Sequence, residues 1–187
     1  SPNSISKTEE ANILRNFDKN LKKSIDLAFT RLKKFHSKQR FSSFKYKDKY
    51  KNELSYNFSP IDRVGVYVPG GTASYPSTVL MNCIPALVAG VKNIYLTTPT
   101  LGSKVNPAII YAAKKCNVKE IYKTGGAHSI AAFAYGTKNF EKVDKIVGPG
   151  NAFVACAKKE VFGDVGIDMV AGPSEVSLVA DKFAEPD

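Results

Sequence analysis

Apolar residues recur at intervals of three and four along the N-terminal part of the chain. Ser6 and Glu9 have the Ser-x-x-Glu spacing of a capping box, and the apolar positions after them are Leu14, Phe17, Leu21, Ile25, Ala28, Leu32 and Phe35. This pattern predicts one long amphipathic helix that ends near Arg40. His36 falls on or beside its apolar edge, and we interpret it as a partly buried histidine at the helix end rather than as a catalytic group.

The periodicity loosens over residues 41–60, where aromatic residues alternate roughly with polar ones. Short strands or an extended connector fit this stretch. From Val64 onward the apolar period alternates regularly between strand and helix. Strands are expected at 64–68, 93–97, 120–123, 145–147, 167–170 and 175–180, and helices behind Pro76 and at 107–116, 129–135 and 152–162. This alternation predicts an α/β fold with a Rossmann-like, mostly parallel sheet and helices on both faces.

Glycine follows four of the predicted strands, in the loops 69–71, 125–128, 148–151 and 171–174. In a parallel sheet, ligands bind beyond the carboxyl ends of the strands. Gly70 and Gly71 allow close backbone approach, and the helix behind them would offer free N–H groups to a phosphate or carboxylate. Simple chain reversal is the alternative explanation, but it would not concentrate glycine at one end of the strands. We therefore favour a binding edge.

The composition and charge narrow the class of protein. The chain has 187 residues, of which 43% are hydrophobic and 24% charged, so it can bury a core as a globular protein. Its net charge is +10, but residues 1–51 hold 14 Lys and Arg against 5 Asp and Glu, while the remainder is almost neutral. A basic helix without interleaved aromatic residues is typical of a solvated face, so we do not expect nucleic-acid binding.

No apolar run has the roughly 18 to 20 residues of a membrane span, and the N-terminus SPNSISKTEE has no signal-peptide core, so we expect no membrane association and a cytoplasmic location. Cys83, Cys116 and Cys156 lie far apart in apolar helix patterns and are expected to be buried thiols.

Several common motifs are absent. There is no G-x-G-x-x-G after the first strand, no Walker A loop, no H-x-x-x-H and no C-x-x-C, so any nucleotide must be held in another way and this chain builds no transition-metal site alone. No general base stands out, because Ser174 has no recognisable His partner, and Asp168 and Glu175 could equally be structural.

Four segments together resemble the histidinol dehydrogenase family. They are RVGVYVPGGTASYPSTVLMNCIPALVAGV, EIYKTGGAHSIAAFAYGT, VDKIVGPGNAFVACAKKEVFG and IDMVAGPSEVSLVAD, in family order from about Arg63 to Asp181. Weaker similarity extends back through Lys34-Phe35-His36. The strings GPGNAFV and DM-x-AGPSEV are the most specific.

The resemblance implies a known activity and architecture. The family oxidises L-histidinol through L-histidinal to L-histidine in two NAD-dependent steps, as a homodimer with zinc, on an architecture also like that of aldehyde dehydrogenases. It implies that Tyr67 and Asn151, with the Gly70-Gly71 turn, contact NAD, and that Ser174 contacts the substrate. His128 also falls at an NAD-contacting position, where the family usually has glutamine. An imidazole can still donate one hydrogen bond there.

Family members are much longer than this chain and carry their catalytic Glu–His pair and zinc ligands beyond the position of Asp187. We therefore assign no catalytic and no metal-binding residue here, and expect a catalytically incomplete fragment. Its expected parts are an N-terminal helix and connector of an incomplete partner domain (1–62), a Rossmann-like NAD-binding domain (63–174) and a strand leading back to the partner domain (175–187). The alternative is a stand-alone nucleotide- or phosphate-binding module without catalysis.

Overall fold

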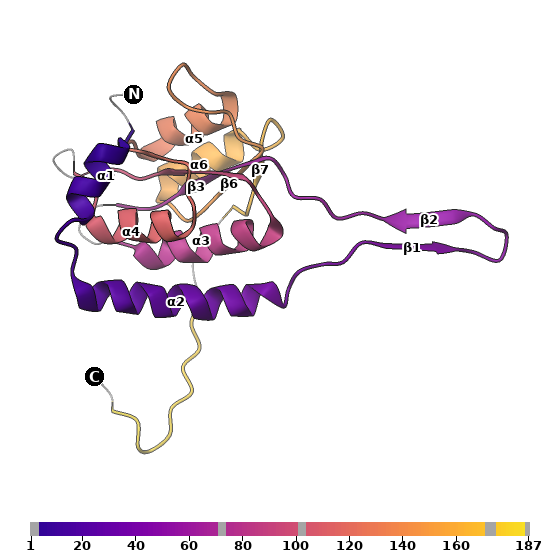
Figure 1. Cartoon of the computed structure of the whole chain (residues 1–187), viewed down its shortest axis with the longest axis horizontal. Coiled ribbons are helices and arrows are strands. Elements are labelled where there is room, and N and C mark those ends of the chain that lie inside the picture. The colour runs from indigo at the N-terminus through magenta and orange to yellow at the C-terminus, as the bar shows by residue number, and fades with distance from the viewer. Residues whose placement is uncertain (1–3, 71–73, 101–103, 171–174, 186–187) are drawn as a thin grey trace.

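The centre of the molecule is a parallel sheet of five strands (Figure 1). The structure is a computed structural model that describes residues 4–70, 74–100, 104–170 and 175–185. The strands are β3 (Arg63–Tyr67), β4 (Asn93–Thr97), β5 (Glu120–Tyr122), β6 (Lys145–Val147) and β7 (Gly166–Ile167). Their spatial order is β5-β4-β3-β6-β7, so the chain returns past β3 after β5 and continues on its other side. The strand order therefore reverses between β3 and β6, the kind of point at which parallel sheets bind ligands.

Helices cover both faces of this sheet (Figure 1). Alternate residues of β3 point to opposite faces: Val64 and Val66 belong to the core shared with α3 (Pro76–Ala89) and α4 (Pro107–Lys115). Tyr67 belongs to the core shared with α5 (Gly126–Tyr135) and α6 (Ala152–Glu160). The architecture is thus the predicted Rossmann-like α/β fold, and all four of these helices were expected from the sequence.

The N-terminal region forms two helices, not the single long helix that the periodicity predicted. They are α1 (Lys7–Leu14) and α2 (Lys19–Ser37). Ser6 caps α1 as expected, its hydroxyl accepting from the Glu9 N–H at 3.1 Å. The break arises because the Asp18 carboxylate caps a new helix, accepting from the Leu21 N–H at 2.6 Å. The apolar spacing continues across this turn, which is why periodicity alone did not detect it.

Helix α2 forms an outer layer against α3 and α4 (Figure 1). Ile25 is its most buried residue, at 4% exposure, and Ala28, Phe29 and Leu32 pack against the same core. Most of the apolar stripe of this helix is therefore covered by the chain's own α3 and α4.

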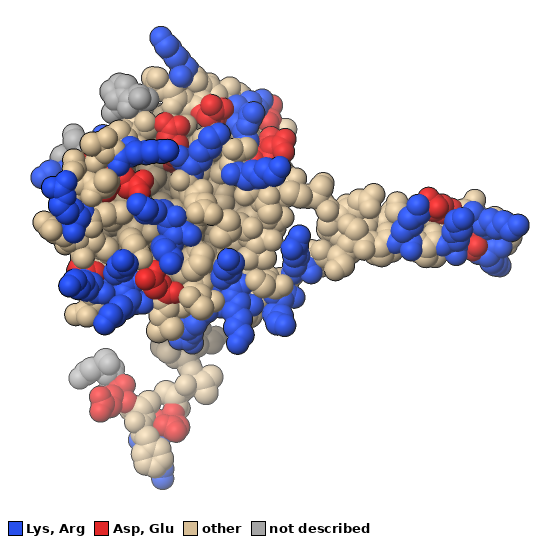
Figure 2. All heavy atoms as spheres, in the orientation of Figure 1, with Lys and Arg blue, Asp and Glu red and all other residues tan. Residues whose placement is uncertain are grey.

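Residues 41–60 form an arm that extends away from the body of the molecule (Figure 1). Its strands, β1 (Phe44–Lys47) and β2 (Glu53–Tyr56), pair antiparallel, which confirms the expectation of short strands. All of their residues are exposed, and aromatic rings stack along the arm, Phe41 on Phe58 at 5.0 Å and Phe44 on Tyr56 at 5.9 Å between centroids. Figure 2 shows Lys and Arg side chains gathered over α2 and along this arm, the basic part of the sequence.

Two predicted strands differ from the structure. The strand expected at 167–170 is β7, which ends at Ile167, and residues 175–180 form no strand. Val176, Leu178 and Val179 in this segment are exposed. Their alternating apolar pattern favours a strand, but a strand requires a neighbour for its hydrogen bonds, and within the described residues this segment pairs with none.

The cysteines agree only in part with the prediction. Cys83 and Cys116 are buried, and a hydrogen bond to Cys116 together with burial raises the pKa of the Cys83 thiol well above its ordinary value. Cys156 is exposed on α6, so the expectation of burial was wrong for that residue. Val154 and Ala157 lie on the inner side of the helix, whereas Cys156, like Phe153, falls on the outer side.

Candidate functional site

The carboxyl ends of the sheet strands meet at one edge, where the loops pack closely on one another. Pro99, just after β4, lies between the loops that follow β3 and β5. A Cβ atom at Gly70 would lie 2.7 Å from the Pro99 carbonyl oxygen, and one at Gly125 would lie 2.6 Å from the Pro99 Cβ. Packing therefore requires glycine at both positions. Because glycine has no side chain, the backbone at these two positions is open to close approach by another molecule.

Tyr67, the last residue of β3, connects this strand to the start of α5. Its side chain is 4% exposed, and its hydroxyl accepts a hydrogen bond from the Gly126 N–H at 3.2 Å. Gly126 is the first residue of α5 and has a φ of +70°, a conformation that favours glycine. The Tyr67 ring is thus buried beneath the sheet edge, and its hydroxyl lies at the start of α5, where a ligand could contact it.

At two helix N-termini of this edge the residue before the helix supplies no side-chain cap, although the Gly126 N–H of α5 donates to the Tyr67 hydroxyl. Neither Tyr75, which precedes α3, nor Gly125, which precedes α5, supplies a side chain that accepts from the helix N–H groups. Uncapped N–H groups carry partial positive charge and favour an anion.

His128 lies in the first turn of α5. The sequence pattern predicted that this helix begins at residue 129, but it begins at Gly126. His128 therefore belongs to the helix and not to the loop. The side chain is exposed, and its Nδ1 would lie 3.4 Å from a Cβ atom at Gly126. The imidazole is therefore next to the uncapped N-terminus of α5.

Asn151 caps the third helix at this edge, α6. Its Oδ1 accepts from the Val154 N–H at 3.1 Å, while the residue as a whole is exposed. Across the part of the chain that the structure describes, its Nδ2 has no hydrogen-bond partner. The cap orients the amide by its oxygen and leaves two N–H donors for another molecule.

The predicted site residues Tyr67, Gly70, His128 and Asn151 thus lie in β3 and in the segments that follow β3, β5 and β6, all at the carboxyl end of one parallel sheet. Gly71 and Ser174 lie outside the described residues. The sequence analysis missed Lys158 and left Asp168 without a role. In the structure these two side chains hold the loop that precedes Asn151, through contacts that no motif in the sequence signals.

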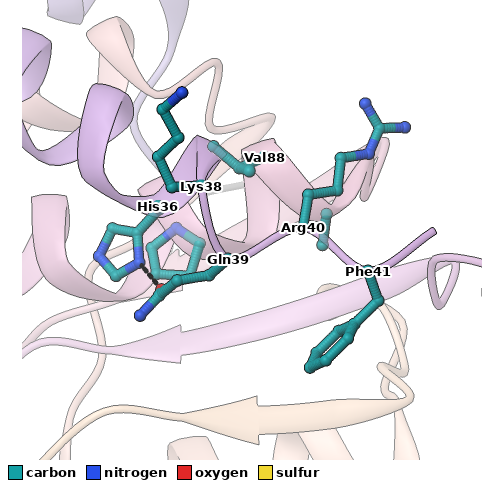
Figure 3. Close-up of a pocket in the computed structure, with 8 residues that line it drawn as sticks. His36, Lys38, Gln39, Arg40, Phe41 and Val88 are labelled. Atoms are coloured by element: carbon teal, nitrogen blue, oxygen red, sulfur yellow. Dashed lines mark hydrogen bonds between the residues drawn. The ribbon is translucent and has the colours of Figure 1, made fainter.

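A separate pocket lies away from this edge, where the end of α2 faces α3. Figure 3 shows His36 and Gln39 turned toward each other, with the Lys38 and Arg40 side chains extending apart from one another. His36 Nδ1 lies 2.7 Å from Gln39 Oε1, and His36 is half-buried at the helix end, as the sequence predicted. The cationic head groups do not converge, so this pocket is a weaker ligand site than the sheet edge.

The described segments contain no group of three or more His, Cys, Asp or Glu side chains placed to hold a metal ion. Nor do the helices in these segments include one that is long and apolar enough to cross a membrane.

Comparison with known proteins gives a consistent result. The family model for histidinol dehydrogenase matches residues 2–187. A histidinol dehydrogenase from Pelagibacter ubique is 59% identical over 93% of this chain, and one from Helicobacter hepaticus is 49% identical over 97%. The crystal structure of histidinol dehydrogenase from Elizabethkingia anophelis superposes with a TM-score of 0.88 at 40% identity, covering 92% of this chain.

The chain spans only about two fifths of these relatives: 41% of the Pelagibacter protein, 42% of the Helicobacter protein and 40% of the Elizabethkingia chain. The matched region nevertheless includes both the sheet and its carboxyl edge. The chain therefore belongs to the histidinol dehydrogenase family.

Proposed function

We propose that this chain is the NAD-binding part of an enzyme that oxidises L-histidinol through L-histidinal to L-histidine. Family membership supports the reaction, and the carboxyl edge of the sheet supports the location of the cofactor. The observation that carries the location is that two helix N-termini without a side-chain N-cap and the exposed Asn151 amide all lie at the carboxyl end of the same parallel sheet.

The residues at this edge fit a dinucleotide. The N–H groups at the starts of α3 and α5 suit the pyrophosphate, and Gly70 and Gly125 allow it to approach the backbone. Asn151 would donate through Nδ2, and His128 would donate where relatives usually have glutamine. We assign Gly71 to the same turn and Ser174 to the substrate, on the resemblance alone. When bound, NAD supplies the hydride acceptor.

We assign no proton-transfer group and no metal ligand to this chain. The resemblance places the zinc ligands of the whole enzyme beyond the position of Asp187, and the described segments contain no group of three or more His, Cys, Asp or Glu placed to hold a metal ion. We also propose that the whole enzyme is a homodimer. The residues described above would accordingly bind and orient the cofactor, while the proton transfers of the reaction would occur on other groups.

A titration of NAD followed by backbone amide NMR tests this proposal. Amide signals of Gly70, Gly126 and Asn151 should shift first, with a dissociation constant of about 0.1 mM to several mM, because only part of the binding cleft is present. Movement of signals along the basic helix α2 instead would mean attraction by charge alone, and would refute the site.

Two substitutions of one residue separate its two roles. Asn151→Ser keeps an oxygen that can cap α6 but removes the amide donors, so it should weaken NAD binding by about 1 to 2 kcal/mol with little change in stability. Asn151→Ala removes both functions and should also lower the free energy of unfolding by about 1 kcal/mol. Equal NAD affinity of wild type and Asn151→Ser would exclude Asn151 as a contact.

A further inference from the structure

An ion pair between a buried lysine and a partly exposed aspartate holds the loop that carries Asn151. Lys158 is the one charged residue that is buried within the described parts of the chain, with its side chain 5% exposed. It lies on α6 two turns after Asn151, and its side chain reaches back toward the start of the helix, the direction that helical side chains favour. Its ammonium group pairs with the carboxylate of Asp168, the residue that follows β7.

The two side chains of the pair hydrogen-bond to the N–H and the carbonyl oxygen of Gly148. Lys158 Nζ donates to the Gly148 carbonyl oxygen at 3.0 Å, and Asp168 Oδ2 accepts from the Gly148 N–H at 2.8 Å. The other carboxylate oxygen of Asp168 accepts from the Met169 N–H at 2.8 Å, which fixes the carboxylate to its own strand end. One peptide segment is therefore held from both sides by opposite charges.

Gly148 is also the point where this loop touches β3. Its φ is +109°, and a Cβ atom there would lie 2.1 Å from the Tyr67 carbonyl oxygen. Three residues later the chain reaches Asn151, whose amide direction depends on where the loop enters α6. Gly150 is equally constrained, since a Cβ atom would lie 2.2 Å from Val154 Cγ1. Displacing Gly148 would therefore displace Asn151.

We infer that Lys158 and Asp168 are positioning residues for the dinucleotide, holding the 148–151 loop so that the Asn151 amide and the neighbouring helix N-termini face one ligand. This inference rests on the proposed function. An ion pair with one buried partner is by itself weak evidence for stability, because desolvation of the buried Lys158 charge offsets much of the attraction. Here the two side chains make hydrogen bonds to the backbone of the loop. This arrangement is expected if the role of the pair is to hold the loop in place.

The test compares two neighbouring lysines of α6. Lys158→Met keeps the apolar stem and removes the charge that holds Gly148. Lys159→Met makes the same chemical change one residue later, at an exposed position. NAD affinity is measured by amide NMR titration, and the free proteins are compared through the Gly148 and Asn151 amide signals.

We expect Lys158→Met to shift the Gly148 and Asn151 signals before NAD is added and to weaken NAD binding about 10-fold or more, as for loss of a hydrogen bond from a charged group. Lys159→Met should do neither. Ile110→Val, a mild core change in α4 on the opposite face of the sheet, serves as a destabilised control and should leave NAD affinity unchanged. An effect of equal size in Ile110→Val would show that Lys158 acts through stability alone.

A second variant covers the case in which Lys158→Met does not fold. Lys158→Met/Asp168→Asn removes both charges, leaves no unpaired ion, and should fold while still binding NAD weakly. Wild-type affinity in a folded variant of either kind would overturn the inference. If wild type itself shows no NAD-dependent shifts at the sheet edge, the proposed function fails instead, and the two failures are thereby distinguished.

Discussion

Gly148 and Gly163 have almost the same backbone torsion but different surroundings. Their φ values are +109° and +108°. A Cβ atom at Gly148 would lie 2.1 Å from the Tyr67 carbonyl oxygen, whereas one at Gly163 would meet nothing within 4 Å. Comparing these two glycines separates the energetic cost of an unfavourable torsion from the cost of a steric collision. Of the two, only Gly148 lies at the proposed site.

We predict that Gly163→Ala lowers the free energy of unfolding by about 1 to 2 kcal/mol, the cost of a left-handed torsion for an L-residue. Gly148→Ala should cost more than about 3 kcal/mol, because the backbone of β3 cannot yield as a flexible side chain would. Urea unfolding of the two variants measures both values. Equal losses would mean that the loop shifts freely away from Tyr67.

At this scale the sequence predicted which residue types gather at the edge, but not their contacts. Glycine after a strand indicates a loop with backbone freedom, but the cap that Asn151 forms on α6 was not predicted. The hydrogen bond from Gly126 to Tyr67 joins residues 59 positions apart, and the one from Lys158 to Gly148 spans 10 positions, from α6 back to the loop before it. A single sequence carries no signal for such pairs, because neither partner has an unusual local pattern.

Helix α2 is attached to α4 by a polar contact as well as by its apolar stripe. The Tyr111 hydroxyl donates to Asp26 Oδ1 at 2.8 Å, and Lys115 Nζ lies 3.0 Å from the same oxygen. Partial burial acts to raise the pKa of Asp26, but the hydrogen bonds from Tyr111 and Lys115 outweigh it, and the net pKa is lower than the ordinary value of 3.8. Burial and the Asp26 hydrogen bond raise the pKa of Tyr111 to about 12, so it remains a neutral donor from acid to neutral pH.

This contact predicts a pH-dependent contribution to stability. Because the pKa of Asp26 is lower in the folded than in the unfolded chain, its contribution is fully present above the unfolded pKa and is lost as the pH falls through the folded value. The Asp26 side chain is 38% exposed, so we expect at most about 1 kcal/mol. The difference in unfolding free energy between wild type and Asp26→Asn should therefore shrink between pH 7 and pH 2.5. Parallel losses in the two proteins would contradict the prediction.

The helices and strands that have a clear apolar periodicity in the sequence were predicted well. The five strands of the sheet and the four helices around it follow from the change of apolar period. The break between α1 and α2 does not, because Asp18 caps a helix at a point where the apolar spacing continues. The segment 175–180 shows the reverse failure: its alternation favours a strand, but the partner that would complete a ladder is not among the described residues.

Over the whole molecule, the strand order was not predicted, although the parallel direction was. Alternating strands and helices imply crossovers and hence a shared carboxyl edge, and that edge exists. Which strands are neighbours depends on packing across the whole sheet. The return of the chain to place β6 beside β3 brings the Gly148 loop against Tyr67. The candidate site is thus a product of the topology, assembled from loops that the sequence marks one at a time.

The groups that could bind a transition metal are dispersed over the molecule. His36 lies at the end of α2, and His128 lies on α5 at the sheet edge. Cys83 and Cys116 are buried together in the core below α3 and α4, where the raised pKa of Cys83 disfavours the thiolate that a metal requires. Cys156 is exposed on α6. None of the described segments brings three such groups together.

We therefore predict that the purified 187-residue chain retains well under one zinc ion per molecule after dialysis and forms no NADH from histidinol, while still giving NAD-dependent NMR shifts at the sheet edge. A tetrahedral zinc site needs three or four ligands in one place, and two nearby donors give only weak, exchangeable binding. Metal analysis of the dialysed protein and absorbance at the NADH band measure the two quantities, with a full-length relative as the positive control. Stoichiometric zinc would require ligands from segments that the structure does not describe or from a second copy of the chain. Turnover would place the proton-transfer groups within these 187 residues and overturn the assignment of this chain to cofactor binding alone.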